Sequence, residues 1–138
     1  MPNTAKIIGL GAYLPKKVLS NKDLEKIVDT TDDWIVSRTG MKERRIADSE
    51  EYTSDMGIAA ASKALNDAGL EPQEIDLIVV ATLTPDYTFP STACIIQNAL
   101  GCINAASVDV QAACSGYVYA LSMAKAYIDS GMYKNILI

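Results

Sequence analysis

The chain has 138 residues, of which 49% are hydrophobic and 21% charged, an ordinary composition for a soluble globular protein. This length predicts one domain, residues 1–138, with enough chain for one hydrophobic core. The formal net charge of −5 disfavours a general nucleic-acid binder, because phosphate binding needs a basic face. It leaves room for a local basic pocket that binds a phosphorylated small molecule.

The chain has three cysteines and no histidine. An odd number of cysteines without paired spacing argues against a disulfide scaffold and favours a reducing compartment, the cytoplasm. The absence of histidine and the wide cysteine spacing give no zinc pattern, so we expect no metal site. The amino terminus lacks the long apolar core of a signal peptide, and the apolar stretch 112–124 is shorter than the roughly 20 residues needed to span a bilayer, so no membrane association is expected.

Local patterns predict the elements of the first half. The run Lys6–Gly11 (KIIGLG) is apolar and ends in glycine, which favours a buried strand. Asn21 is the predicted cap of a short helix. Thr31 is the predicted cap of the next helix, with acidic residues in its first turn and Gly40 as its stop.

The second half alternates helices with strands. We expect helices from Thr53 to Gly69, from Ser91 to Gly101 and from Cys114 to Ser130, and strands in DLIVVATL (76–83), ASVDV (106–110) and NILI (135–138). This alternation predicts crossover connections and a mostly parallel sheet covered by helices on both faces, an α/β layered fold. The last predicted strand is still apolar at the end of the printed sequence, so we expect either a fragment or a second chain that covers it.

Cys114 lies in AACSG, where a predicted strand meets a predicted helix. A thiol reacts as its thiolate, and the partial positive charge of a helix amino terminus favours that form. The small neighbours leave room for a substrate carbonyl, and a backbone N–H at the turn is suited to stabilise an oxyanion. On the pattern alone, a cysteine that packs as a small hydrophobe is the favoured reading.

Other candidate motifs are weaker. Cys94 lies on an apolar helix face and is expected to pack, while Cys102 follows a glycine and is expected in a loop without a role. Gly9 and Gly11 match part of a dinucleotide-binding fingerprint, but the third glycine is missing and Pro15 prevents a helix from opening there, so we reject that reading.

The segment from Asp33 to Arg45 holds the only tryptophan, Trp34, beside cations and hydroxyls. An indole can stack on a nucleobase, and cations with hydroxyls can bind phosphate. On composition alone, a charged surface with Trp34 as a packing anchor is the favoured reading.

Together these segments resemble the amino-terminal half of a β-ketoacyl-acyl-carrier-protein synthase III, a condensing enzyme of the thiolase fold. The resemblance runs from KIIGLGAYLPKKVLSNKDLEKIVDTTDDWIVSRTGMKERRIA through IDLIVVATLTPDYTFPSTACIIQNALG to SVDVQAACSGYVYALSMAKAYIDSG and covers essentially the whole chain. DDWIVSRTG and AACSG at this separation are specific as a pair.

The resemblance implies roles for individual residues. Cys114 matches the nucleophile that accepts an acyl group from acyl-coenzyme A, which is a substrate, so no cofactor is implied. Trp34 matches the residue that stacks on the adenine of coenzyme A, and three further positions match those along that ligand's path: Thr30, Arg38 and Thr39. Phe89 resembles the residue that reaches across a homodimer interface to bound the partner's acyl pocket, although packing within the chain is an alternative.

The resemblance also implies a second step, decarboxylative Claisen condensation with malonyl-acyl-carrier protein in fatty acid synthesis. In the family a histidine and an asparagine from a second half of the chain support the thiolate and the enolate. The present sequence has neither that half nor any histidine. Condensation by these 138 residues alone is therefore not expected.

Three alternatives stay open on the sequence. The chain is a non-catalytic half-domain that acts only by pairing with another chain, or it is part of a related polyketide starter synthase. A cysteine hydrolase is a third reading, but it needs a general base, for which no histidine is present.

Overall fold

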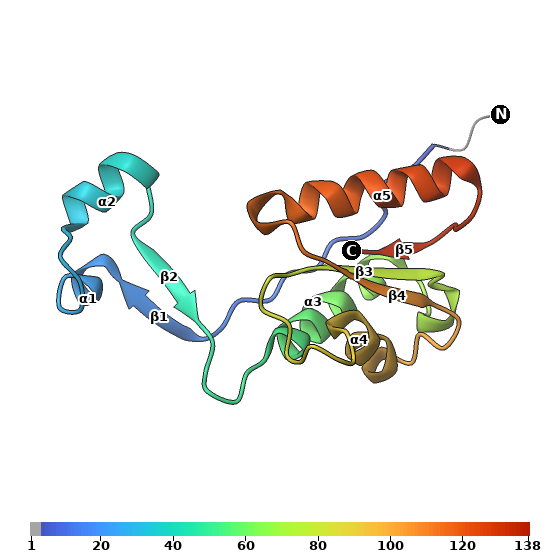
Figure 1. Ribbon diagram of the computed structural model, residues 1–138, viewed down its shortest axis with the longest axis horizontal. Coiled ribbons are helices and arrows are strands. Elements are labelled where there is room, and N and C mark those ends of the chain that lie inside the picture. The colour runs from blue at the N-terminus through green and yellow to red at the C-terminus, as the bar shows by residue number, and fades with distance from the viewer. Residues whose placement is uncertain (1–3) are drawn as a thin grey trace. The chain divides into compact units, whose positions relative to one another are not determined.

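The computed structural model describes residues 4–138. The chain forms two compact units, each described by itself: residues 14–52, called the small unit, and residues 4–13 with 53–138, called the sheet unit (Figure 1). The single domain expected over residues 1–138 stays a prediction, because two compact units can belong to one domain.

The small unit is an antiparallel strand pair with two helices between its strands. Strands β1 (Lys17–Ser20) and β2 (Glu43–Ile46) pair along their full length, with Ser20 opposite Glu43. Helix α1 (Asn21–Leu24) is a single turn, and α2 is longer (Asp32–Thr39). The predicted limits of α2 are confirmed: the Thr31 side chain accepts from the Trp34 N–H, and Gly40 ends the helix at φ 71°.

The prediction that Asn21 caps the first helix is wrong. Ser20 is the cap, and its hydroxyl and backbone exchange hydrogen bonds with Asp23 as a capping box. Asn21 is instead 1% exposed, and its amide donates to the Asp32 carboxylate and the Met41 carbonyl at 2.7 and 2.8 Å. Arg44 donates to its amide oxygen at 2.7 Å. One buried side chain thus ties α1 to α2 and β2.

The sheet unit contains the predicted alternation of helices and strands. In chain order its elements are α3 (Thr53–Ala68), the 3₁₀ turn η1 (Pro72–Glu74), β3 (Leu77–Ala81), α4 (Thr92–Leu100), β4 (Ala106–Val110), the 3₁₀ turn η2 (Ala113–Ser115), α5 (Gly116–Ser130) and β5 (Ile136–Leu137). The strands form a parallel sheet in the order β4-β3-β5, with Leu77 opposite both Ala106 and Ile136. The predicted α/β layered fold is confirmed.

Alternating side chains of β3 build two cores, one on each face of the sheet. Ile78 packs with Leu65 of α3 and Ala93 of α4, whereas Leu77 and Val79 pack with Ala120 of α5. Figure 1 shows the corresponding layers, with α5 on one face of the sheet and α3 and α4 on the other. A strand buried on both faces explains why β3 is apolar throughout.

The strand predicted over Lys6–Gly11 is not formed in the structure. This segment instead runs along α3, so closely that a Cβ on Gly11 would lie 2.0 Å from the Ala60 carbonyl oxygen. The Leu10 N–H donates to the Asp67 carboxylate at 2.9 Å, and the Lys63 ammonium donates to the Ala12 carbonyl at 2.7 Å. Contacts with a helix thus hold this apolar run in place of strand pairing.

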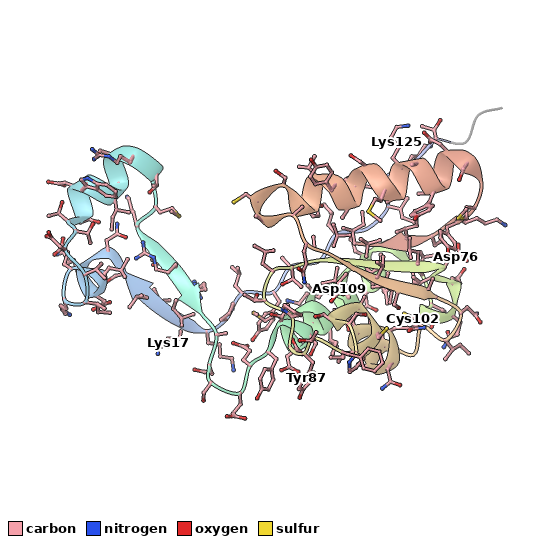
Figure 2. The ribbon with its side chains drawn as sticks, viewed as in Figure 1. Lys17, Asp76, Tyr87, Cys102, Asp109 and Lys125 are labelled. Atoms are coloured by element: carbon pink, nitrogen blue, oxygen red, sulfur yellow. The ribbon has the colours of Figure 1, made fainter. Side chains whose placement is uncertain are left out.

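Cys102 lies in the loop between α4 and β4, as predicted, but the prediction that it has no role is wrong. It is fully buried and belongs to the core between the sheet and helices α3 and α4 (Figure 2). Burial raises the pKa of its thiol, because the charged form is desolvated. Cys102 therefore acts as a small core hydrophobe. Cys94, expected to pack, is half-buried on α4.

Within residues 4–138, none of the helices is long and apolar enough to cross a membrane. The same residues contain no gathering of three or more histidine, cysteine, aspartate or glutamate side chains that is suited to hold a metal ion.

Candidate active site

Cys114 lies where the parallel sheet passes into α5. Strand β4 ends at Val110, and η2 then turns the chain, with Cys114 as its central residue and an exposed side chain. The helix was predicted to begin at Cys114, but α5 begins two residues later, at Gly116. In this turn the Ser115 N–H donates to the Ala112 carbonyl at 3.0 Å. The two residues are three apart, which is the hydrogen-bond spacing of a 3₁₀ helix, and the α-helical spacing begins only after them.

The residue before Cys114 has an unusual backbone. Ala113 has φ 45°, and no other residue except glycine has a positive φ in the part of the chain that the structure describes. A Cβ-bearing residue in this region is strained, and such conformations persist only where the surrounding structure holds them. The Cys114 side chain that follows this turn is exposed, as nucleophiles on strand–helix turns require.

The amino terminus of α5 has no internal cap. Ser115 makes no side-chain capping bond, and the first turn contains no acidic residue. The first backbone N–H groups of a helix have no intrahelical partners and carry partial positive charge. Beside Cys114 they are suited to stabilise the oxyanion formed when a thiol adds to a carbonyl.

Helix α5 is covered on one side in this chain. Gly116, Ala120 and Ala124 are buried against the sheet, but the opposite side is open, with Tyr117, Val118 and Tyr119 between 55% and 62% exposed. The sheet supplies a cover for only one face.

A cavity of about 800 Å³ lies in the sheet unit, lined by the 4–11 segment, α3, β3, β5 and part of α5. Tyr117 and Leu121 contribute to its wall, but Cys114 does not. The candidate nucleophile is therefore presented to solvent and lies outside the lining of this cavity.

The four residues predicted along the coenzyme A path all belong to the small unit. Two of them are brought together, because the guanidinium carbon of Arg38 lies 4.4 Å from the centre of the Trp34 ring. Trp34 is 53% exposed, so the indole is a surface group of α2 and not the buried packing anchor that was the alternative. Whether it binds coenzyme A stays a prediction.

Thr39 and Thr30 are placed differently. The Thr39 hydroxyl donates to the Ile35 carbonyl at 2.7 Å and accepts from the Met41 N–H at 3.1 Å, so it has one remaining lone pair for a ligand. Thr30 is half-buried and directly precedes the α2 cap.

Phe89 lies in the loop between β3 and α4, called the 82–91 loop. Its side chain is 88% exposed, and Leu83 and Tyr87 of the same loop are 58% and 62% exposed. Plain packing within the chain, the alternative for Phe89, is thus not seen in this structure. A role at a dimer interface stays a prediction.

Sequence reasoning missed Asp109, which it treated only as part of a strand. Its carboxylate accepts from the backbone N–H groups of Thr92 and Ala93, both at 2.8 Å. The one signal in the sequence was an acidic residue between two valines of a predicted strand, which indicates that polar partners exist but not which ones.

An exposed cysteine on a tight turn between a parallel strand and an uncapped helix lies here in a layered α/β fold, which the solved structures similar to this chain identify as the thiolase fold. A family profile described as 3-Oxoacyl-[acyl-carrier-protein (ACP)] synthase III matches residues 108–138. The chain belongs to the β-ketoacyl-acyl-carrier-protein synthase III family.

Two curated relatives carry this similarity across the chain. The beta-ketoacyl-[acyl-carrier-protein] synthase III of Caldanaerobacter subterraneus subsp. tengcongensis is 54% identical over 134 residues, which cover 97% of this chain and 40% of the relative. The protein of the same name from a Sulfurovum species is 59% identical over 138 residues, covering 99% of this chain and 41% of the relative. The chain thus spans about two fifths of the length of the curated relatives it matches.

Solved structures agree with the sequence matches. The chain superposes on 3-oxoacyl-[acyl-carrier-protein] synthase III from Aquifex aeolicus with a TM-score of 0.91 and 56% identity, covering 95% of this chain and 42% of that one. It also matches the priming beta-ketosynthase of the R1128 polyketide pathway, with a TM-score of 0.89 and 40% identity over 97% of this chain and 41% of that one.

Proposed function

We propose that this chain is the acyl-accepting part of an enzyme that initiates type II fatty acid synthesis. The Cys114 thiolate adds to the carbonyl carbon of an acyl-coenzyme A, the bond between that carbon and the coenzyme A sulfur breaks, and coenzyme A leaves as a thiolate that takes up a proton. The acyl group then remains on Cys114 as a thioester. The observation that carries this proposal is the exposed Cys114 beside the uncapped amino terminus of α5.

Condensation follows in the longer protein. Malonyl-acyl-carrier protein loses carbon dioxide, the resulting carbanion attacks the thioester carbonyl, and the Cys114 thiolate leaves. The groups that stabilise such a carbanion include general acids, and this chain has no histidine to supply one. The proposal therefore assigns the first step to these residues and the second to an assembly that contains further chain.

Coenzyme A is proposed to bind the small unit through Trp34 and Arg38, with Thr30 and Thr39 along its path. The exposed indole and the adjacent guanidinium suit a nucleotide, which carries an aromatic base and phosphates. The intact enzyme is proposed to be a homodimer in which Phe89 bounds the partner's acyl pocket, and its exposure leaves the ring available for this contact. We place the enzyme in the cytoplasm, a placement that the three free thiols support.

Labelling the cysteines tests the first step. The purified chain is incubated with acetyl-coenzyme A and digested, and the acetylated peptide is identified by mass. We expect the label on Cys114, its loss in Cys114→Ala and its survival in Cys94→Ala. A label on Cys94 or Cys102 would assign the chemistry to the wrong thiol and overturn the proposal.

A second candidate is a non-catalytic module that only pairs with another chain. The exposed apolar side chains of the 82–91 loop favour it. This candidate predicts that the chain associates but is not acetylated. Light scattering measures the mass of the assembly for the wild type and for Phe89→Ala. Together with the labelling result, it separates the non-catalytic module from the acyl-accepting enzyme. The match to a polyketide priming synthase keeps a starter-unit role within the first candidate.

A further inference from the structure

The Asp109 carboxylate joins β4 to the start of α4. One oxygen accepts from the Thr92 N–H and the other from the Ala93 N–H, each at 2.8 Å, while Ser91 caps the same helix by accepting from Cys94. Thr92 and Ala93 are fully buried, so water cannot replace the carboxylate at their N–H groups. An ionised acceptor at a helix amino terminus is favoured by both hydrogen bonding and the helix dipole.

This joint belongs to a polar contact between β4 and α4. Ser107, two residues earlier on the same face of the strand, donates its hydroxyl to the Gln97 side chain at 3.1 Å. Val108 and Val110, on the other face, pack towards α5 instead. In the described sheet β4 is an edge strand paired only with β3, and its contacts with α4 on one face of the sheet add to that single pairing.

The same strand end holds both ends of the 82–91 loop. At the start of the loop, the Thr82 N–H donates to the Val110 carbonyl at 3.2 Å. Just past its end, Thr92 and Ala93 donate to Asp109. Two consecutive residues of β4 therefore fix the loop that carries Phe89, and η2, which holds Cys114, begins three residues after Val110.

We propose that Asp109 is a positioning residue for acyl transfer: by fixing α4 and the 82–91 loop to β4, it holds the strand end from which the strained Ala113–Cys114 turn projects. The inference rests on the proposed function of Cys114. Asp109 touches no reacting atom and acts through the strand end, so its loss misplaces a thiol that remains exposed. A misplacement of about 1 Å is sufficient to cost as much as a hundredfold in rate.

Asp76 provides a matched control. Its carboxylate also accepts two backbone N–H groups, from Lys134 at 2.8 Å and Asn135 at 3.0 Å. It directly precedes β3, whereas Asp109 lies near the far end of β4, and Figure 2 labels both residues. Asp109→Asn and Asp76→Asn thus remove comparable structural contacts in the same unit.

The test compares wild type, Asp109→Asn and Asp76→Asn by two reactions of Cys114. Acetylation by acetyl-coenzyme A requires correct placement, whereas alkylation by iodoacetamide requires mainly an accessible thiol. For Asp109→Asn we expect the maximal acetylation rate to fall about tenfold or more. The half-saturating concentration of acetyl-coenzyme A and the alkylation rate should each stay within about twofold, and Asp76→Asn should change none of the three.

Several outcomes overturn the inference: an unchanged acetylation rate in Asp109→Asn, a parallel fall in alkylation, or an equal effect of Asp76→Asn. If wild type is alkylated at Cys114 but not acetylated, the proposed function fails separately. Amide hydrogen exchange then decides the positioning role. Faster exchange of residues 82–95 and 111–115 in Asp109→Asn, but not in Asp76→Asn, supports it, and unchanged exchange there rejects it.

Discussion

The guanidinium of Arg38 stacks on the indole of Trp34, four residues earlier on α2, with 4.4 Å between the guanidinium carbon and the ring centre. Residues four apart lie one above the other on a helix, so the pair forms a continuous aromatic and cationic surface. Arg38 covers one side of the ring, and 53% of Trp34 is still exposed. A nucleobase with attached phosphates is the ligand that this pair suits best.

Trp34→Ala should weaken the binding of acetyl-coenzyme A. Stacking of a base on an aromatic side chain contributes about 1–3 kcal/mol, so we expect a loss of about tenfold or more in affinity, measured by isothermal titration calorimetry. Trp34→Phe retains a smaller ring and should fall between wild type and alanine. Equal affinities for all three proteins, with folding intact, would show that Trp34 does not contribute to the binding of acetyl-coenzyme A.

The chain alone should form no β-ketoacyl product. Condensation requires groups that stabilise an enolate, and general acid–base catalysis alone typically contributes 10²–10⁴-fold. The sequence contains no histidine for this role. Purified chain incubated with acetyl-coenzyme A and malonyl-acyl-carrier protein is analysed by mass spectrometry, with an intact synthase III as positive control. Acetoacetyl product from the 138 residues would show that they contain a complete condensing site.

The layered part of the fold could be predicted because its signals are local. For the apolar strand β3 and for the capped helices α2 and α4, residue propensity, hydrophobic pattern and turn residues all predict the same element. The strand prediction for Lys6–Gly11 failed because an apolar run of this length is also compatible with other structures. Its glycines permit a close approach to α3, and only the tertiary structure reveals that contact.

The candidate site was predictable in part. Cys114 was recognisable from its small neighbours and its place between strand and helix. The positive φ of Ala113 was not, because alanine gives no signal for that conformation. Asp109 was missed because its partners are backbone N–H groups of a helix that begins 17 residues earlier in the chain. Hydrogen bonds of this kind leave no side-chain pattern in a sequence.

Asn21→Ala should destabilise the small unit. The substitution leaves the Arg44 guanidinium, the Asp32 carboxylate and the Met41 carbonyl without a buried partner. These groups are half-buried or exposed, and each loses a hydrogen bond of the kind that contributes about 0.5–1.5 kcal/mol, so we expect a fall of about 1–3 kcal/mol in the free energy of unfolding. Denaturant unfolding followed by the fluorescence of Trp34, the single tryptophan, measures it.

The matched control is Lys22→Ala, which removes an exposed side chain from the same turn of helix. Exposed substitutions of this kind usually change stability by less than about 0.5 kcal/mol. If both variants unfold at the same denaturant concentration, Asn21 does not tie the unit together as its contacts indicate.

Asp23 should make the small unit lose stability in acid. Hydrogen bonds from the Ser20 hydroxyl, then from Lys26 and the Ser20 backbone, lower its pKa from 3.8 to about 2. Because the folded state holds the proton more weakly than the unfolded state, the ionised carboxylate stabilises folding above pH 3.8, and that contribution is lost as the pH falls to about 2. Asp23→Asn should flatten the pH dependence of the unfolding midpoint across this window, measured by Trp34 fluorescence.

Asp29→Asn, which removes an exposed carboxylate beyond α1, should retain the wild-type slope. Identical slopes for Asp23→Asn and wild type would mean that the capping box does not couple to the proton equilibrium.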